Sequence, residues 1–531
     1  MKILRKPLAL ALVLMLALGM ALSVSAAEGE SGFGGMPAGT YTYVSGDPTA
    51  EAGTGEGQVK LDYLTDTIVW AFGGQSGSAV LSGDALKFFQ GLYLSDLPVT
   101  DWFGGDPKDT EGYAGAVSGY AKFTLDGAGR ISAIDVSANP ATRATAVLSK
   151  DITAETLTII GITRGQPNLL QSCITLVGSV NGLYLTKQGD VILNHLTIGS
   201  GADGVGLKAD KIGGDTFIVG RVFVDGSVEW HNLMGVILPL GSESGILETN
   251  GQSISLTGGS NVGRVGRNLS IISNGGDITI GAEVTTDSTR GGLLPNANTA
   301  NDGVTVNTSG RIIAGAGNVT IGTNTEKAVI IDLIGEIQGN NVTIRPNNRG
   351  TVANITGAIG SINATGNIDI EVGTVNVNTG DANVNDTNGF TSWVSAGNDG
   401  SNVIGSLTSE NGGIRLKAGA VNGGIGALSA PKGTVTLDVE SADSVSARQA
   451  PLSVNGQAVS LDGYLINGNH FFTLDSLAGV LPGVDLTGVA VSAINIGGSN
   501  YCKLRDVGAA AGFGVDWDAA AGTVVITTGV G

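Results

Sequence analysis

The sequence predicts a mainly β protein whose centre is a right-handed parallel β-helix, a solenoid in which short strands stack coil upon coil. Three observations predict it: a recurring apolar, polar, apolar triplet, a spacing of about two dozen residues between its copies, and 86 Gly among 531 residues. Alternation with period two and β-branched residues is typical of a half-buried strand. The triplets are Leu269–Ile271, Ile278–Ile280, Val319–Ile321, Val342–Ile344, Ile368–Ile370, Ile414–Leu416 and Val435–Leu437.

The triplet spacing predicts one strand per coil. From Val319 onward the triplets begin 23, 26, 46 and 21 residues apart, and we interpret 46 as two steps of 23. A single coil cannot bury its own apolar row, so the coils must stack. Leu196–Ile198 and Ile254–Leu256 extend the series upstream with irregular spacing, which predicts projecting loops, above all at Thr285–Gly303. We place the β-helix at residues 142–440. The side chains expected to point inward include Ile278, Ile280, Val319, Ile321, Val342 and Ile344.

The residue before a triplet is often Asn or Asp. Both types tolerate a left-handed backbone, so we expect them to form the turn that leads into each strand. The abundant Gly lacks a strict triplet period, which excludes collagen and indicates many tight turns. The residues concerned are Asn268, Asp277, Asn318, Asn341 and Asn367.

Residues 1–26 have the pattern of a secretory signal peptide. Basic residues at positions 2, 5 and 6 precede an apolar run over Leu8–Leu22, and small residues follow at Val24–Ala27. The alternative, an uncleaved membrane anchor, is disfavoured because the run is short and ends in small residues. We expect an extracellular protein, secreted or associated with the cell surface, with no membrane span after cleavage.

The charge and the cysteines exclude two classes of protein. Without the three basic signal residues the formal charge is (28 − 3) − 47 = −22, and such an acidic surface repels phosphate backbones. We therefore expect no nucleic-acid partner. Cys173 and Cys502 fall in regions assigned to different domains, so we favour two small buried residues over a disulfide framework.

An N-terminal β-rich domain is predicted at residues 36–141, where half of the aromatic residues gather, 13 of 26. Two alternating runs within Tyr120–Val136 flank a Gly-containing turn and predict a hairpin. We expect this domain to cover the first coil, because an open solenoid end exposes strand edges and core. Trp102 and Phe103 could alternatively form a stacking platform for sugar rings, although packing within the domain is favoured.

Two family resemblances follow. The Gly-rich coils with repeated Asn-Val-Thr-Ile phrases resemble the haemagglutinin-type and pectate-lyase-type right-handed β-helices of bacterial surface proteins, in style over about 300 residues. For adhesin-like proteins this implies an exported rod with binding surfaces on its flanks. Ile496–Val507, Gly514–Asp518 and Thr523–Ile526 resemble the copper amine oxidase N-terminal-like domain found at the ends of exported Gram-positive proteins. We place this domain at residues 451–529.

The residues of that region predict a small α+β fold. Tyr501 and Lys503 should point to one side of a strand, and Cys502 and Leu504 to the other. Asp506 is a candidate N-cap for a helix over Val507–Ala511, which Gly512 ends. A copy lies 30 residues upstream (496 − 466 = 30), where Phe472 takes the position of Cys502. A structural role for Cys502 follows.

The sequence predicts no catalytic, cofactor-binding or metal-binding residues. An oxidase copper site needs three His and a Tyr followed by an acid, whereas Asn500–Cys502 lacks the acid. The three His are widely separated: His195, His231 and His470. Asn301–Gly303 faintly resembles a polygalacturonase motif, but Arg311–Ile313 does not complete it. Acids could still converge from stacked coils, and the candidates are Asp277, Asp332 and Asp369.

We therefore expect an exported, non-catalytic, adhesin-like structural or binding protein. Its candidate partners are cell-envelope or host-matrix glycans or proteins. One alternative is a polysaccharide lyase or glycoside hydrolase, which would show as three or more carboxylates, or carboxylates with Arg or Lys, converging in a groove on one β-helix face. Another is a carbohydrate-binding protein that uses the N-terminal aromatics, which would show as exposed coplanar rings.

Overall fold

The structure is a computed structural model of the whole chain. It describes residues 33, 35–44, 46–62, 64–94, 121–136, 143–161, 173–186, 190–210, 216–233, 236–239, 245–258, 263–265, 269–282, 304–322, 330–345, 354–372, 374–376, 402–426, 428–445, 449–466, 469–496 and 499–529.

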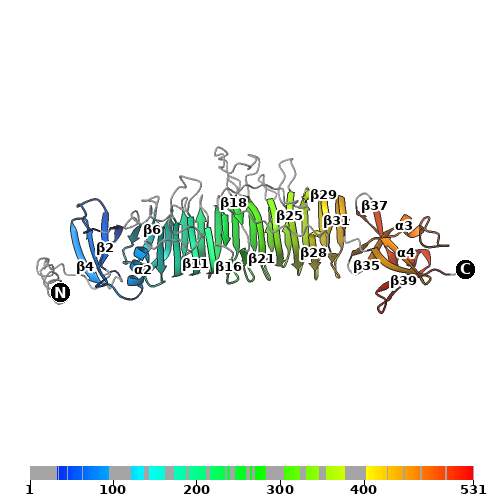
Figure 1. The fold of residues 1–531 in the computed structure, drawn as a ribbon, viewed down its shortest axis with the longest axis horizontal. Helices are drawn as coiled ribbons and strands as arrows, with labels where there is room; N and C mark the ends of the chain where they lie inside the picture. The colour runs from blue at the N-terminus through cyan, green and yellow to red at the C-terminus, as the bar shows by residue number, and fades with distance from the viewer. Residues whose placement is uncertain are drawn as a thin grey trace, which may run out of the picture.

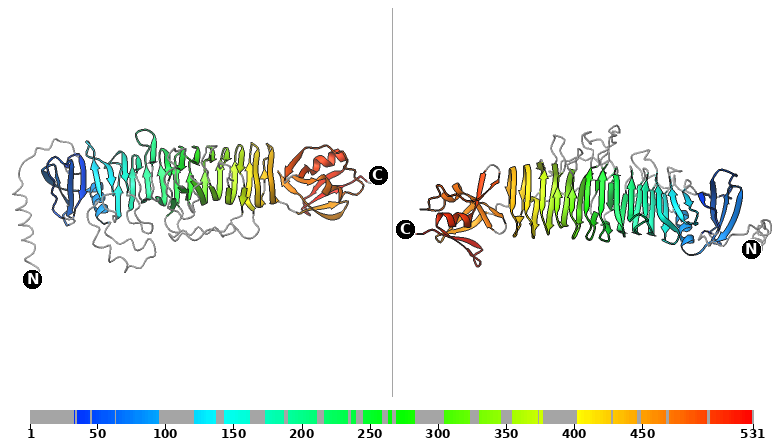
Figure 2. Two further views of the ribbon diagram at one scale, coloured as in Figure 1. Left: turned by 90° about the horizontal axis from the view of Figure 1, so that it is seen from above. Right: turned by 180° about the vertical axis from the view of Figure 1, so that it is seen from behind.

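The protein is mainly β, and its long parallel sheets are compatible with a β-helix or solenoid. The strands run in one elongated row, with the N-terminal strands at one end and the C-terminal strands at the other (Figure 1). Figure 2 shows the same row from two further sides. The prediction of a mainly β protein with stacked parallel strands is confirmed.

The triplets build the first of three parallel sheets. Each strand of this first sheet pairs in parallel with the strand one coil further on. Its strands are β6 (Ile131–Asp135), β8 (Thr153–Ile160), β10 (Leu183–Thr186), β12 (Val205–Asp210), β14 (Ser227–Leu233), β17 (Ile254–Gly258), β20 (Ile278–Ala282), β22 (Val319–Ile321), β24 (Val342–Ile344), β26 (Ile368–Val372), β29 (Ile414–Ile425) and β31 (Val435–Val445).

A second sheet precedes the first in each coil. Its strands are β7 (Arg143–Leu148), β9 (Cys173–Val180), β11 (Asp190–Ile198), β13 (Thr216–Val224), β16 (Gly245–Thr249), β19 (Leu269–Ile272), β21 (Val304–Ile313), β23 (Ile330–Gly339), β25 (Asn354–Ala364), β28 (Asn402–Ser409) and β30 (Leu428–Ser429). A third sheet joins parts of the longer strands to β15 (Val236–Pro239), β18 (Gly263–Val265) and β27 (Thr374–Asn376). Two predicted triplets, Leu196–Ile198 and Leu269–Ile271, belong to the second sheet and not to the first.

The register explains the triplet pattern and corrects its spacing. Ile278 pairs with Val319, which pairs with Val342, so identical positions stack. The six side chains predicted to point inward are all fully buried. The interpretation of 46 residues as two coils is wrong, because Ile368 pairs directly with Ile414. The predicted loop at Thr285–Gly303 lies outside the described residues.

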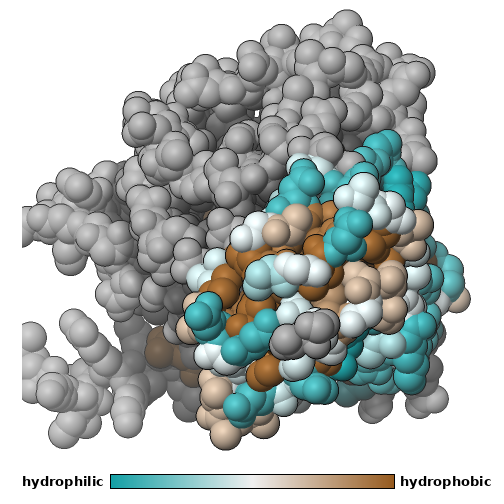
Figure 3. Space-filling view, turned by 90° about the vertical axis from the view of Figure 1, so that its right-hand side faces the viewer, coloured by the Kyte–Doolittle hydropathy of each residue, from teal (hydrophilic) through white to brown (hydrophobic). Residues whose placement is uncertain are grey.

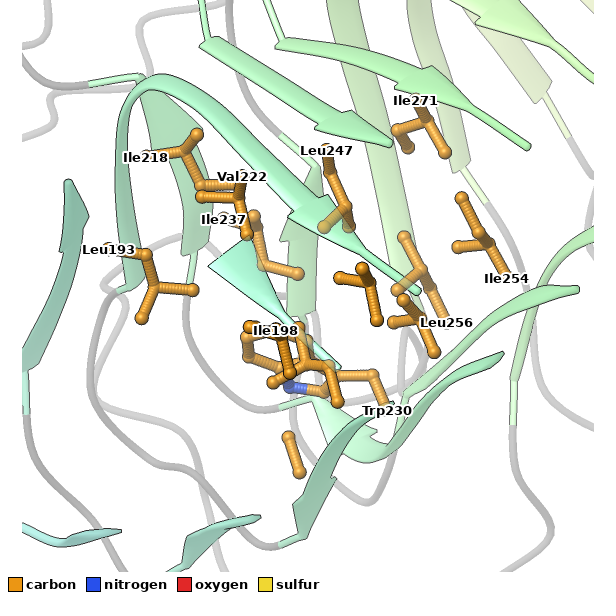
Figure 4. Packing of buried hydrophobic residues seen from close by; sticks show 14 of the residues in the cluster. Leu193, Ile198, Ile218, Val222, Trp230, Ile237, Leu247, Ile254, Leu256 and Ile271 are labelled. Atoms are coloured by element: carbon orange, nitrogen blue, oxygen red, sulfur yellow. The ribbon is translucent and has the colours of Figure 1, made fainter. Parts of the chain in front are cut away.

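The core lies between the three sheets. In Figure 4, Leu256 of the first sheet, Leu247 of the second and Ile237 of the third point toward one another. Trp230 fills the same space and is fully buried, and its indole nitrogen has no hydrogen-bond partner. Apolar contact alone therefore holds this large ring in place.

The Asn and Asp residues before the triplets form a ladder, which corrects their predicted role. Asn318 donates from its backbone N–H to Asp277 Oδ1 over 2.7 Å, and Asn341 donates from Nδ2 to Asn318 Oδ1 over 2.9 Å. The backbone N–H of Asn367 donates to Asn341 Oδ1 over 2.8 Å. None of these four residues has positive φ. Their side chains link successive coils, so the expectation of a left-handed turn is wrong. Asn268 lies outside the described residues.

The N-terminal region extends the first sheet through mostly antiparallel strands, and only β1 and β2 pair in parallel there. The predicted hairpin is confirmed, because β5 (Lys122–Leu125) pairs antiparallel with β6, which also pairs in parallel with β8. Helix α2 (Gly83–Leu94) packs on β7, where Gly91 lies against Val147. The remaining strands are β1 (Gly39–Tyr43), β2 (Glu56–Asp62), β3 (Thr67–Phe72) and β4 (Gln75–Val80).

The C-terminal region combines two small sheets with two helices. One sheet contains β32 (Gln449–Val454), β33 (Gln457–Asp462), β38 (Gly514–Asp518) and β39 (Thr523–Thr527). The other contains β34 (Tyr464–Ile466), β35 (Asn469–Thr473), β36 (Ala493–Ile496) and β37 (Ser499–Lys503), and it continues from the stack because β34 pairs in parallel with β30. The helices are α3 (Leu474–Ala478) and α4 (Leu504–Ala511), and the region has its own buried cluster.

The predicted internal copy has a symmetric register. Phe472 pairs with Cys502 across β35 and β37, and the pair Phe471–Lys503 corresponds to the pair Tyr501–Thr473 after a shift of 30. Cys502 is a buried free thiol, as predicted, and burial raises its pKa. The predicted alternation is confirmed as well, because Leu504 is buried while Tyr501 and Lys503 are half-buried.

The start of α4 differs from the prediction. The helix begins at Leu504 with Lys503 as its N-cap, and Asp506 lies in the first turn. A carboxylate there still favours the helix, because it faces the positive end of the helix dipole. Gly512 ends the helix with φ of 80°, as expected.

The C-terminal region covers the end of the stacked sheets. Tyr464, Phe471, Ile494 and Tyr501 pack against the core of the stack, whereas Phe472 and Cys502 belong to the region's own cluster. Side chains alternate between the two faces of a strand, so one face of this small sheet packs against the core of the stack and the other packs into the region's own cluster. The predicted domain limits stay predictions.

Candidate functional site

The outer face of the first sheet carries one polar column in register. Ser255, Thr279, Thr320 and Thr343 follow one another on β17, β20, β22 and β24. Asp369 and Arg415 then continue the column on β26 and β29. The hydroxyl-bearing part of the face therefore gives way to a charged part. We call Arg345, Asp369, Glu371, Arg415 and Lys417 the charged ladder.

The charged ladder is linked by ion pairs from coil to coil. Arg345 Nη2 contacts Asp369 Oδ2, and Arg415 Nη1 lies 2.7 Å from Asp369 Oδ1. Arg415 Nη2 lies 3.1 Å from Glu371 Oε2, and Lys417 Nζ lies 2.9 Å from Glu371 Oε1. Arg415 thus joins both carboxylates. The strand spacing explains the geometry, because parallel strands place aligned side chains about 5 Å apart.

The electrostatics favour the charged form of Glu371. Hydrogen bonds from Lys417 and Arg415 lower the pKa of Glu371, and the bonds to Asp369 and Glu371 raise the pKa of Arg415. A general acid needs the opposite shift, because it must hold a proton near neutral pH. The charged ladder is therefore suited to binding and to linking coils, and a carboxylate of this kind can act as a base or an electrostatic contact.

The sequence had singled out only one member of this ladder. Of the three candidate acids, Asp369 belongs to the charged ladder. Asp277 directly precedes β20, which is three strands away from β26, and it accepts hydrogen bonds from Asn318 there. The side chain of Asp332 lies outside the described residues. The missed residues had a signal: Asp369 and Arg415 occupy the middle of consecutive triplets, and Glu371 and Lys417 follow each of them by two positions.

A second, smaller ion pair lies on the second sheet. Arg221 Nε lies 2.5 Å from Glu248 Oε2, and Asn274 Nδ2 donates to Glu248 Oε1 over 2.7 Å. The hydrogen bond from Arg221 lowers the pKa of Glu248. This cluster repeats the same principle, in which charges on neighbouring coils bind one another.

Metal-binding groups are not brought together within the described residues. No three His, Cys, Asp or Glu side chains there lie close enough to hold an ion. His195, His231 and His470 lie on β11, β14 and β35. The Asn301–Gly303 motif lies outside the described residues, and no helix in the described part of the chain is long and apolar enough to cross a membrane.

The described N-terminal aromatics form a core and not a platform. Tyr41, Phe88 and Phe123 are fully buried, and Phe88 meets Phe123 edge to face at 5.7 Å. Trp70 is also buried. Trp102 and Phe103, the pair considered for sugar stacking, lie outside the described residues.

A second candidate surface lies at the C-terminal end. Figure 3 faces this end and shows apolar side chains gathered between hydrophilic ones. Trp517 on β38 is 55% exposed. Its register partner on β39 is the buried Val524, so Trp517 extends the apolar face of the sheet toward solvent.

No known protein family, curated protein or solved structure matches the chain.

Proposed function

We propose that the stacked sheets form a right-handed parallel β-helix and that the protein is an exported, non-catalytic, adhesin-like rod. Residues 1–26 direct export, the rod presents its polar outer face to glycans or proteins of the cell envelope or host matrix, and the C-terminal region mediates attachment. The protein then works outside the cell, secreted or associated with the cell surface. The resemblance to the copper amine oxidase N-terminal-like domain remains part of this proposal.

One observation carries the proposal: polar side chains on the outer face bind one another from coil to coil. The ladder from Asp277 to Asn367 and the ion pairs around Asp369 both join successive coils. Such bonds favour a long, stiff face with fixed spacing. The exposed Trp517 supports a contact role for the C-terminal end, and so do the apolar side chains that Figure 3 shows on that end.

The proposal is tested by cell fractionation and by a glycan array with the chain from residue 27 onward. We expect the protein in the extracellular or envelope fraction, and binding to a glycan class without turnover. A cytoplasmic location, or release of reducing or unsaturated sugars from any polysaccharide, would contradict it.

A polysaccharide lyase or hydrolase is the second candidate, and the charged ladder is the observation that favours it. Two carboxylates there meet two Arg and a Lys on one face. These are residue types that such an enzyme uses for catalysis. In that case Asp369→Asn and Arg415→Ala would each abolish sugar release. If the parent chain releases no sugar, this candidate fails.

A further inference from the structure

Strand β4 presents a free edge at the N-terminal end of the molecule. It pairs antiparallel with β3, and no other described strand pairs with its second edge. It lies at the end of the row of strands (Figure 1). Its sequence, Gln-Ser-Gly-Ser-Ala-Val, has neither a charge nor a proline. Unprotected edges of this kind are templates for pairing with another strand.

Strand β36 at the other end of the molecule is also an uncharged edge, but it packs against β31, whereas two other edge strands there carry charges. Strand β38 carries Asp516 and Asp518 within five residues, and β33 ends in Asp462. Charges on an edge discourage pairing, because a second strand would bury or oppose them. Since the formal charge of the whole chain is −19, a neutral edge stands out against an acidic background.

The inner face of β4 is filled, so only its edge and outer face are free. A side chain at Gly77 would meet the Trp70 ring, and its Cβ would lie 2.4 Å from that ring. Ser76, Ser78 and Val80 alternate on the exposed outer face. Val80 ends β4 and Leu64 lies in the turn between β2 and β3. They are 74% and 95% exposed, and they are two of the three exposed large apolar side chains in the described residues.

We propose that β4 is a self-association surface and that its partner is β4 of a second copy of this chain. A two-fold antiparallel pair places identical neutral segments side by side, so no like charges meet. The two backbones would form the N–H and C=O ladder of an antiparallel pair, with the small side chains of Ser76, Gly77 and Ser78 on the two faces of the joined sheets. A second copy is favoured over an oppositely charged partner, because the edge offers no charge to complement. The dimer joins two rods at their N-terminal ends and leaves both C-terminal ends free.

The test uses the chain from residue 27 onward and measures its mass in solution by light scattering after size exclusion. We expect twice the chain mass, falling to the chain mass on dilution. The variant Ser76→Asp/Ser78→Asp and the variant Ser76→Lys/Ser78→Lys should each give the chain mass, because like charges oppose one another in the two-fold registers centred on residues 76 to 78. Mixing the two variants should restore the doubled mass.

The matched control is Ala458→Asp/Ser460→Asp, which places two charges at the same spacing on exposed positions of β33. It should leave the doubled mass unchanged, and circular dichroism should show that every variant is folded. A parent chain that has the chain mass at all concentrations overturns the proposal. So does a dimer that survives both β4 variants, or a mixture of the two variants that stays monomeric.

Discussion

The stacked sheets and the C-terminal region solve the same packing problem in different ways. In the stack, a buried residue such as Ile321 rests on its counterpart one coil away, Ile344, and the pattern has no internal end. In the C-terminal region, a segment is paired with its own copy, and Phe472 meets Cys502 inside a closed cluster. A repeating stack can grow but cannot close itself. The symmetric pair closes, and it supplies the stack with an end.

Removing residues 449–531 breaks this relation, and we expect it to have the largest effect. The deletion exposes β31 and the apolar surface that Tyr464, Phe471 and Tyr501 cover, so the shortened chain should aggregate. The soluble yield on expression, with size exclusion of the soluble part, measures the effect.

The complementary fragment, residues 449–531, should stay soluble and folded because it has its own buried cluster. Its circular dichroism and its cooperative thermal unfolding check this. If the shortened chain is as soluble and monomeric as the parent, the C-terminal region does not act as a cap.

The sequence was informative where local pattern decides the structure. Alternation placed Val342 and Ile344 correctly in the core, and the 30-residue copy, which makes Cys502 equivalent to Phe472, correctly predicted that Cys502 is buried. The sequence was misleading where the number of residues between two triplets was used to predict the number of coils between them. The 46 residues before Ile414 make a single step, because a spacing includes connecting segments as well as strands.

The glycines sharpen the comparison, because they serve different purposes in the two regions. A Cβ at Gly317 would lie 2.1 Å from the carbonyl oxygen of Gly276 one coil below, although its backbone is not left-handed. At Gly512 the space is open but φ is 80°. We expect Gly317→Ala to lower the free energy of unfolding by about 2–4 kcal/mol through overpacking. Gly512→Ala should cost only about 1 kcal/mol of backbone strain.

Chemical denaturation of both variants and of Gly127→Ala measures these differences. Gly127 has neither positive φ nor an atom within 4 Å of its added Cβ, so its variant should match the parent chain. If Gly317→Ala and Gly512→Ala lower the free energy of unfolding equally, close contact between coils is not the reason why the stack needs Gly at position 317.

The ladder side chains could not be assigned from sequence, because Asn suits a left-handed turn as well as a bond to the next coil. Only the register decides between these roles. Asn341 donates to Asn318 and accepts from Asn367, whereas its neighbour Asn340 reaches Asn318 Oδ1 only at 3.5 Å. The charged ladder had the same difficulty, since Arg415 meets Asp369 only when one coil spans 46 residues.

Asn341→Ala should therefore destabilise the chain by about 1–2 kcal/mol, because it leaves the backbone N–H of Asn367 without its acceptor. Asn340→Ala is the matched control and should change the free energy of unfolding by less than about 0.5 kcal/mol. Hydrogen exchange at the Asn367 amide adds a local measurement, and exchange should accelerate only in the first variant. Identical behaviour of the two variants would remove the ladder as a stabilising feature.

The smallest effect concerns the charged ladder and depends on pH. Lys417 and Arg415 lower the pKa of Glu371 in the folded chain, so the folded state favours the carboxylate more than the unfolded state does. The resulting stability is fully present above the unfolded Glu pKa of about 4.3 and disappears as the pH falls through the lower folded pKa.

Because the Glu371 side chain is 39% exposed, solvent screening limits the contribution to about 1 kcal/mol or less. The free energy of unfolding of Glu371→Gln should be lower than that of the parent at pH 7, and the two should converge once the pH has fallen below the folded pKa of Glu371. In a Lys417→Met background, which lacks the first partner, the difference at pH 7 should shrink. A difference that stays constant from pH 7 to acid would show that Glu371 stabilises the stack through packing and not through its charge.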